Sequence, residues 1–118
     1  MITLYGIKNC DTVKRARQAL TEAGIDFRFH DFKADGLPVA LAQHWIEHLG
    51  IDTVINRQGT TWRKLDEATR NRLTADTAPA LLNREPSLVK RPVIDADGQL
   101  SVGFARKDEA AIVARLSA

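Results

Sequence analysis

The chain has 118 residues, of which 44% are hydrophobic and 27% are charged, and its formal net charge is +2. This length suits one globular domain that buries a core without the help of disulfides or metal. So small a net charge argues against nucleic-acid binding, which needs basic residues gathered on one face or in a tail. The sequence has no recognisable signal peptide, no apolar run of transmembrane length and a single cysteine, so we expect a cytoplasmic protein that does not bind membranes.

The first third of the chain predicts a strand, a helix and a second strand. Residues 2–5 form a short apolar segment, and apolar residues then recur at helical spacing over 11–23, where Gly24 follows as a stop signal. Residues 27–32 alternate between apolar and polar, as a half-buried strand does. Such a unit predicts two parallel strands that are joined by a right-handed crossover helix.

The middle of the chain predicts a run of helices. Gly36 and Pro38 interrupt the strand pattern, and Pro38 suits the first turn of a new helix. Apolar spacing predicts helices over 38–49, 66–73 and 78–85, a short helix or turn over 53–59, and an irregular segment over 60–65. We therefore expect a helical insertion over about residues 36–87.

The last third returns to strands and ends in a helix. Residues 93–95 and 100–102 flank Asp97-Gly98, which is a strong hairpin signal, and residues 108–116 have helical spacing. The complete order of elements is that of an α/β, thioredoxin-like fold with a mixed four-stranded sheet. We expect residues 1–118 to form a single domain of this kind, interrupted by the helical insertion.

Cys10 stands at the N-terminus of the first predicted helix and is the only thiol in the chain. Backbone N–H groups and the helix dipole favour anions there, so the thiolate is favoured over the thiol. Lys14 and Arg15 would strengthen this effect, whereas Asp11 would oppose it. The alternative is a small buried core residue, because free cysteine is often buried. Any chemistry at Cys10 needs a second thiol from outside the chain.

Three arginines are candidate anion-binding residues. Arg91 precedes Pro92 in an X-Pro bond that is a candidate cis peptide, and in a thioredoxin-like fold this loop lies beside the start of the first helix. A guanidinium placed there suits an oxyanion or a carboxylate. Arg57 lies in a predicted turn, and Arg106 precedes the last helix. For all three, a solvated surface arginine is the alternative.

His44 and His48 are four residues apart on one predicted helix, a spacing that suits zinc. No third ligand is apparent, so a solvated helix face is the favoured interpretation, and we expect no metal site. His30 belongs to the alternating pattern of the second strand and is interpreted as a strand-face residue.

Several segments together resemble the arsenate-reductase-like (ArsC/Spx/MgsR) family, and most closely its YffB branch. They comprise YGIKNCDTVKRAR at 5–17, then residues 30–37, 56–65 and 86–93, and finally Gly103-Phe104, so they cover nearly the whole chain. By this resemblance Cys10 matches the nucleophilic cysteine and Arg91 the arginine before the cis-proline. The remaining matches are Pro92 as that proline, Arg57 and Arg106 as two further anion-binding arginines, and Asn9 and Thr12 as structural neighbours of the cysteine.

The resemblance implies a glutathione-dependent thiol oxidoreductase that uses Cys10 as its single nucleophile. Glutathione would be the co-substrate, glutaredoxin a partner, and no cofactor would be tightly bound. The chain departs from the arsenate reductases at three places: Gly6 replaces a histidine, and Asp11 and Val13 replace small residues. A carboxylate beside the nucleophile argues against arsenate as the substrate, because like charges repel.

The same resemblance implies an alternative, a regulatory protein like Spx that binds RNA polymerase without contacting DNA. Spx regulators carry a Cys-x-x-Cys motif, whereas Val13 occupies the place of the second cysteine here. If the protein is such a regulator, it therefore works without an intramolecular disulfide switch.

Overall fold

The computed structural model describes all of residues 1–118 and contains two compact units. The first unit comprises Met1–Ala34 and Arg91–Ala118, and the second comprises Asp35–Lys90. The second unit is the region predicted as the helical insertion. That the two units fold as one domain stays a prediction.

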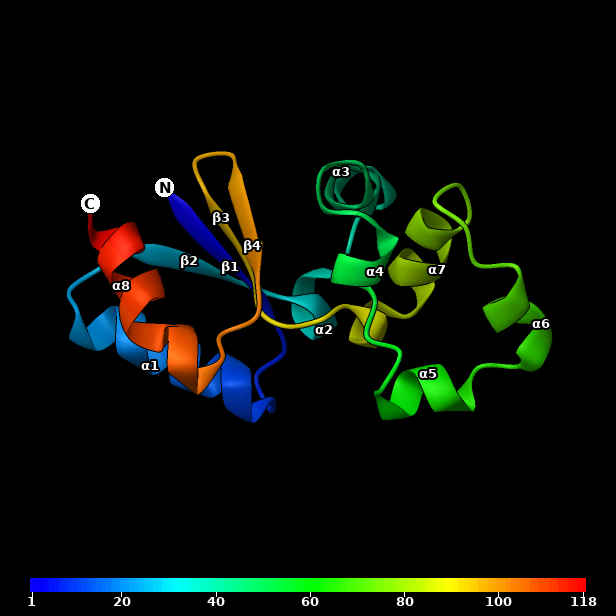
Figure 1. The fold of residues 1–118 in the computed structure, drawn as a ribbon, viewed down its shortest axis with the longest axis horizontal. Helices are drawn as coiled ribbons and strands as arrows, with labels where there is room; N and C mark the ends of the chain where they lie inside the picture. The colour runs from blue at the N-terminus through cyan, green and yellow to red at the C-terminus, as the bar shows by residue number, and fades with distance from the viewer. The chain divides into compact units, whose positions relative to one another are not determined.

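The first unit is built on a mixed four-stranded sheet, as predicted. Its strand order is β2 (Phe27–Asp31), β1 (Ile2–Gly6), β3 (Val93–Ala96) and β4 (Gln99–Val102). β1 runs parallel to β2 and antiparallel to β3, and β4 returns antiparallel to β3. Two helices, α1 (Asp11–Glu22) and α8 (Glu109–Ser117), pack together against this sheet (Figure 1).

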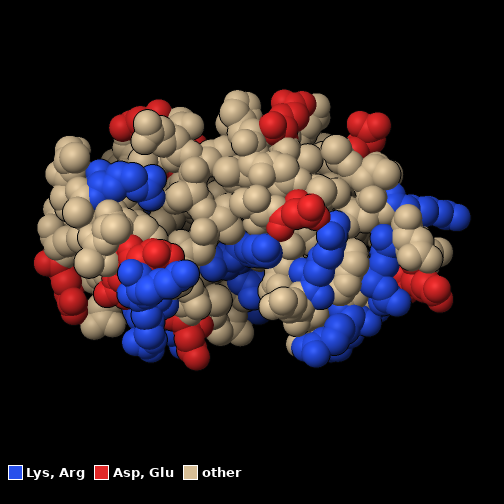
Figure 2. All heavy atoms as spheres, viewed as in Figure 1, with Lys and Arg blue, Asp and Glu red and all other residues tan.

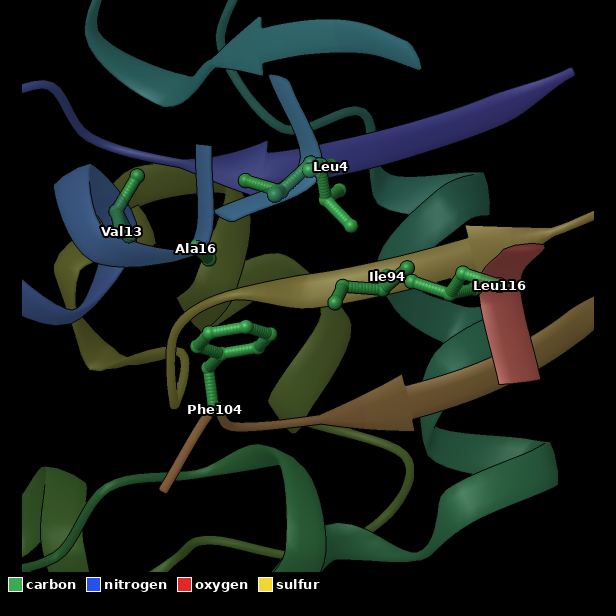
Figure 3. Packing of buried hydrophobic residues seen from close by; sticks show 7 residues of the cluster. Leu4, Val13, Ala16, Ile94, Phe104 and Leu116 are labelled. Atoms are coloured by element: carbon green, nitrogen blue, oxygen red, sulfur yellow. The ribbon is translucent and has the colours of Figure 1, made fainter. Parts of the chain in front are cut away.

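The core of the first unit lies between the sheet and these two helices. Leu4 and Ile94 are opposite each other in the β1–β3 register, so their side chains share one face of the sheet. Figure 3 shows the Phe104 ring beside Ala16 and Ile94 in this cluster. The buried cluster consists of Leu4, Val13, Ala16, Leu20, Ile94, Phe104 and Leu116. Removal of these apolar side chains from water is the main force that holds α1, and with it Cys10, against the sheet.

Turns and helix ends follow the signals in the sequence. Asp97 and Gly98 both have positive φ, of 53° and 96°, which a two-residue hairpin between β3 and β4 requires. α1 ends one residue before the predicted limit, with Ala23 as its C-cap. Gly24 has a φ of 71°, and the N–H of Ile25 donates to the carbonyl oxygen of Leu20 at 3.0 Å. This arrangement satisfies carbonyl groups of the last turn.

The second unit is helical. No helix in either unit is long and apolar enough to cross a membrane. The short helix α2 (Phe32–Asp35) follows β2 directly, and its last residue is the first residue of the second unit. α3 packs against α7, and Trp45, Leu82 and Leu88 are fully buried in this unit. Its helices are α3 (Val39–Leu49), α4 (Ile51–Val54), α5 (Thr60–Lys64), α6 (Glu67–Asn71), α7 (Ala78–Arg84) and the 3₁₀ turn η1 (Pro86–Leu88).

One prediction about this unit was wrong, and a second was right only in part. Residues 60–65 were expected to be irregular, but Thr60–Lys64 form α5, whose first turn closes with the N–H of Arg63 donating to the carbonyl oxygen of Gly59 at 3.3 Å. One turn is too short for helical periodicity to show in the sequence. Residues 53–59 were expected to form a short helix or turn. The helix lies earlier, at Ile51–Val54, because residues 55 and 56 pair with the chain at 88–89, and a turn follows at residues 57–58.

Candidate functional site

Cys10 is the N-cap residue of α1. Its backbone is extended, with φ −101° and ψ 123°, and its carbonyl oxygen accepts the N–H of Lys14 at 2.9 Å. The thiol is half-buried against the core cluster of the first unit and forms no capping hydrogen bond. The first N–H groups of a helix have no acceptor within the helix. As the N-cap residue, Cys10 therefore stands at the positive end of the helix dipole of α1.

The residues around Cys10 differ in their exposure. Asn9 is exposed in the turn before the helix, Thr12 is half-buried, and Asp11 is exposed in the first turn of α1. Val13 is fully excluded from solvent. The first turn of α1 thus presents one carboxylate to water close to the thiol, and an apolar side chain to the core.

The sheet register brings the Arg91–Pro92 peptide to the same edge as the Cys10 loop. Val93 lies opposite Tyr5, so the preceding Pro92 comes level with Gly6, where β1 ends and the loop to Cys10 begins. The Arg91–Pro92 bond is cis, as the X-Pro pattern led us to expect. Pro92 is buried and Arg91 is half-buried.

The segment that carries Arg106 is hydrogen-bonded both to Pro92 and to α1, the helix that Cys10 caps. The N–H of Gly103 donates to the carbonyl oxygen of Pro92 at 2.8 Å, and both terminal nitrogens of Arg15 donate to the carbonyl oxygen of Phe104, Nη1 at 3.0 Å. Arg106 then begins a 3₁₀ turn, η2 (Arg106–Asp108), with its side chain exposed. Cys10, Arg91 and the start of this segment therefore belong to one edge of the first unit.

The guanidinium of Arg15 makes contacts that its sequence position did not suggest. Its guanidinium holds the Phe104 carbonyl, and its Nη1 lies 3.5 Å from Oε1 of Glu109. The guanidinium also lies 5.5 Å from the centroid of the Phe104 ring. Arg15 thus connects α1 to the chain between β4 and α8. Its position in the sequence, five residues after Cys10, does not predict these contacts. That its charge supports a thiolate at Cys10 stays a prediction.

Arg57 belongs to the second unit. Its Nη1 lies 2.8 Å from Oδ1 of Asp52, and its guanidinium lies 5.6 Å from the centroid of the Trp62 ring. Its side chain remains about half exposed, at 46%. Figure 2 shows basic side chains gathered on the lower part of the face drawn there, and the last turn of α5 carries Arg63 and Lys64. Asp52 is therefore the counter-ion of Arg57 within a largely basic surface.

Tyr5 is a titratable residue at this edge of the sheet that the sequence did not single out. Burial raises its pKa, and the negative charge of Asp95 raises it further. Its ring lies 5.0 Å from that of His30, its partner in the β1–β2 register. In the sequence Tyr5 belongs to a short strand and to the segment at 5–17, and neither marks it as a titratable site.

His44 and His48 lie on the exposed face of α3, with ring centroids 4.1 Å apart. Nδ1 of His48 lies 2.9 Å from the carbonyl oxygen of His44. No group of three or more His, Cys, Asp or Glu side chains is placed to hold a metal ion.

Comparison with known proteins gives this arrangement its context. The model of the ArsC family matches residues 5–112. The chain belongs to the ArsC family. Among solved structures, the YffB protein is 43% identical to this ArsC-family chain, with a TM-score of 0.88, over 96% of this chain and 99% of the other. The predicted thioredoxin-like fold is thereby confirmed.

Other relatives point in two functional directions. A protein from Brucella melitensis, described as related to arsenate reductase, is 44% identical over 93% of this chain and 92% of its own, with a TM-score of 0.77. The global transcriptional regulator Spx of Bacillus subtilis is 26% identical over 106 residues, which are 88% of this chain and 80% of Spx. The relatives of this ArsC-family chain therefore include proteins named for arsenate reduction and proteins named for transcriptional regulation.

Proposed function

We propose that this ArsC-family chain is a glutathione-dependent thiol oxidoreductase with Cys10 as its single nucleophile. The observation that carries the proposal is the position of Cys10. The thiol is the N-cap of α1, is partly accessible and has no capping hydrogen bond. A structural cysteine would instead be fully buried and inert.

The reaction we propose is a monothiol exchange. The Cys10 thiolate attacks one sulfur of a mixed disulfide between a substrate and glutathione. A bond forms between Cys10 and glutathione, and the substrate leaves as a thiolate. A second glutathione thiolate then attacks this adduct, which yields oxidised glutathione and restores Cys10. Each turnover consumes one free glutathione thiolate, which forms oxidised glutathione together with the glutathione half of the substrate's own disulfide, so no second cysteine in the chain is needed.

Arg91 and Arg106 are proposed to attract the carboxylates of glutathione toward this edge of the first unit. Their guanidinium groups suit carboxylates because they offer paired donors in one plane. Asp11, exposed in the first turn of α1, opposes the approach of a compact dianion close to the sulfur. This charge supports a disulfide rather than arsenate as the substrate.

A turnover assay tests the proposal. Purified protein is given a mixed disulfide of cysteine and glutathione together with reduced glutathione, and oxidised glutathione is followed over time, with and without glutaredoxin. We expect turnover that Cys10→Ser abolishes and Arg91→Gln reduces about tenfold, as for the loss of a charged hydrogen bond. Arg72→Gln, which removes an exposed arginine of the second unit, serves as the control. Equal rates for wild type and Cys10→Ser would overturn the proposal.

Similarity to Spx over most of the chain supports a second candidate, a regulator that binds RNA polymerase. Because Val13 replaces the second cysteine, this function would not depend on an internal disulfide. The immobilised protein should then retain RNA polymerase subunits from a lysate equally well as wild type and as Cys10→Ser. Absence of polymerase from both eluates would exclude this candidate.

A further inference from the structure

The sheet of the first unit has β2 as one of its two edge strands. β2 stands at the end of the order β2-β1-β3-β4 and pairs with β1 alone, residue for residue over its whole length. In an edge strand, alternate residues direct their backbone N–H and C=O groups outward, and a further strand can bind there. β2 contains no proline, no glycine and no bulge. Its outer edge is therefore regular enough to pair with an extended peptide.

An open groove lies beside this edge, between β2 and α1. It has a volume of about 440 Å³ and is lined by Lys14, Arg17, Gln18, Thr21, Glu22 and Phe27, all of which belong to the first unit. The five residues from α1 follow one another at three- and four-residue spacing, so they share one face of the helix. A strand added to β2 would direct every second side chain to the α1 side of the sheet, where the groove lies.

Two aromatic rings of β2 lie on the α1 side of the sheet. Phe27 and Phe29 are half-buried, and both pack against the core cluster of the first unit. The guanidinium carbon of Arg17 lies 4.1 Å from the centroid of the Phe29 ring, so its positive charge is level with that residue. Phe27 lines the groove two residues earlier. This separation along β2, about 7 Å, matches that of two successive side chains on one face of an added strand.

The charges of the groove favour an acidic side chain at one end. Neither Lys14 nor Arg17 takes part in an ion pair, whereas the carboxylate of Glu22 accepts a hydrogen bond from Nε2 of Gln18 at 3.0 Å. One carboxylate can therefore lie beside Arg17 and Lys14. A continuous polyanion such as a nucleic acid strand would also meet Glu22 and the exposed Asp26, which would repel it.

We propose that the outer edge of β2 binds an extended acidic segment of a partner protein as a fifth strand. The segment runs antiparallel to β2, because antiparallel pairing is the more stable of the two arrangements. A glutamate or aspartate of the segment lies opposite Phe29, beside Arg17 and Lys14. An apolar residue two positions later lies opposite Phe27 and covers its ring.

A six-residue peptide, acetyl-Thr-Thr-Glu-Thr-Val-Thr-amide, tests this inference. Its binding is measured by NMR titration of the backbone amides of the whole protein. A second peptide with lysine in place of glutamate has the same backbone and the opposite charge. We expect the glutamate peptide to shift the amides of β2 and to bind about tenfold more tightly than the lysine peptide, as for a charged contact. The amides of Leu100 and Ser101 in β4, the other edge strand, should not shift.

Variants and a modified peptide separate charge recognition from strand pairing. Arg17→Gln should bring the affinities of the two peptides within about twofold of each other, whereas Lys107→Gln, an exposed cation outside the groove, should leave the preference unchanged. Proline in place of the threonine between glutamate and valine should abolish binding, because proline cannot continue a paired strand.

Several results would overturn the inference. These are the absence of shifts in β2, equal shifts in β4, full binding of the proline peptide, or an unchanged preference in Arg17→Gln. Tighter binding of a single-stranded oligonucleotide than of the glutamate peptide would also overturn it. Because none of these titrations involves the Cys10 thiol, their outcome is independent of the turnover assay.

Discussion

Val13 occupies the space that a side chain at Gly6 would need. A Cβ atom built on Gly6 would lie 2.7 Å from Cγ2 of Val13 and 3.1 Å from its Cγ1. Val13 is itself fully buried and β-branched, so it cannot easily move away. The glycine and the valine that distinguish this chain from the arsenate reductase pattern are therefore one coupled feature, which packs the first turn of α1 directly on the end of β1.

We predict that Gly6→Ala destabilises the protein by about 1–3 kcal/mol, the usual cost of overpacking a core. Val13→Ala removes both γ-methyl groups, so Gly6→Ala should cost less in that background. Urea denaturation of the wild type, both single variants and the double variant measures this coupling. Strictly additive free energies of unfolding would contradict the packing relationship.

We predict that Arg15→Gln lowers the free energy of unfolding by about 1–2 kcal/mol, because the Phe104 carbonyl loses two donors from a charged, largely buried group. Glu109→Gln is the matched control, since it removes only the 3.5 Å ion pair with Arg15 and should cost less. A loss as large in Glu109→Gln as in Arg15→Gln would show that the carbonyl contact is unimportant.

We predict that Cys10→Ser does not destabilise the protein and gains about 0.5–1 kcal/mol over Cys10→Ala, because serine is a preferred N-cap and Cys10 makes no capping bond. Thermal unfolding of the three proteins measures this difference. A strong loss of stability in Cys10→Ser would instead mark the thiol as a packing residue.

The raised pKa of Tyr5 predicts a pH dependence at the alkaline end. Because the folded state holds the phenolic proton more tightly, the stabilisation is fully present below the ordinary tyrosine pKa of about 10 and is lost as pH rises through the folded value. Denaturation at a series of alkaline pH values should show this fall in the wild type and a shallower one in Tyr5→Phe. Identical slopes would contradict it.

The first unit could be predicted from sequence because its signals are local and agree with each other. The alternation of β2, the stop at Gly24 and the Asp97-Gly98 turn each specify one element, and the strand–helix–strand unit predicts that the first two strands are parallel. The position of Cys10 at the start of a helix followed from the same signals.

What the sequence could not reveal depends on long-range pairing. The partners of Arg15 and of Lys90 lie 89 and 38 residues away, and no local pattern marks them. The pairing of Asp52 with Arg57 is closer, but it requires a bend after α4 that periodicity does not show. The arginines were recognisable as candidates, whereas the groups that hold them were not.

The central claim, that Cys10 is an activated nucleophile toward glutathione disulfides, is tested most directly by its rate of reaction with oxidised glutathione. Intact-protein mass spectrometry follows the addition of one glutathione to the folded protein and to a synthetic peptide of residues 5–17, which carries the same cysteine without the fold. We expect the folded protein to react about tenfold faster, on Cys10, and excess reduced glutathione to reverse the adduct. Reaction of the folded protein at or below the rate of the peptide would contradict this claim.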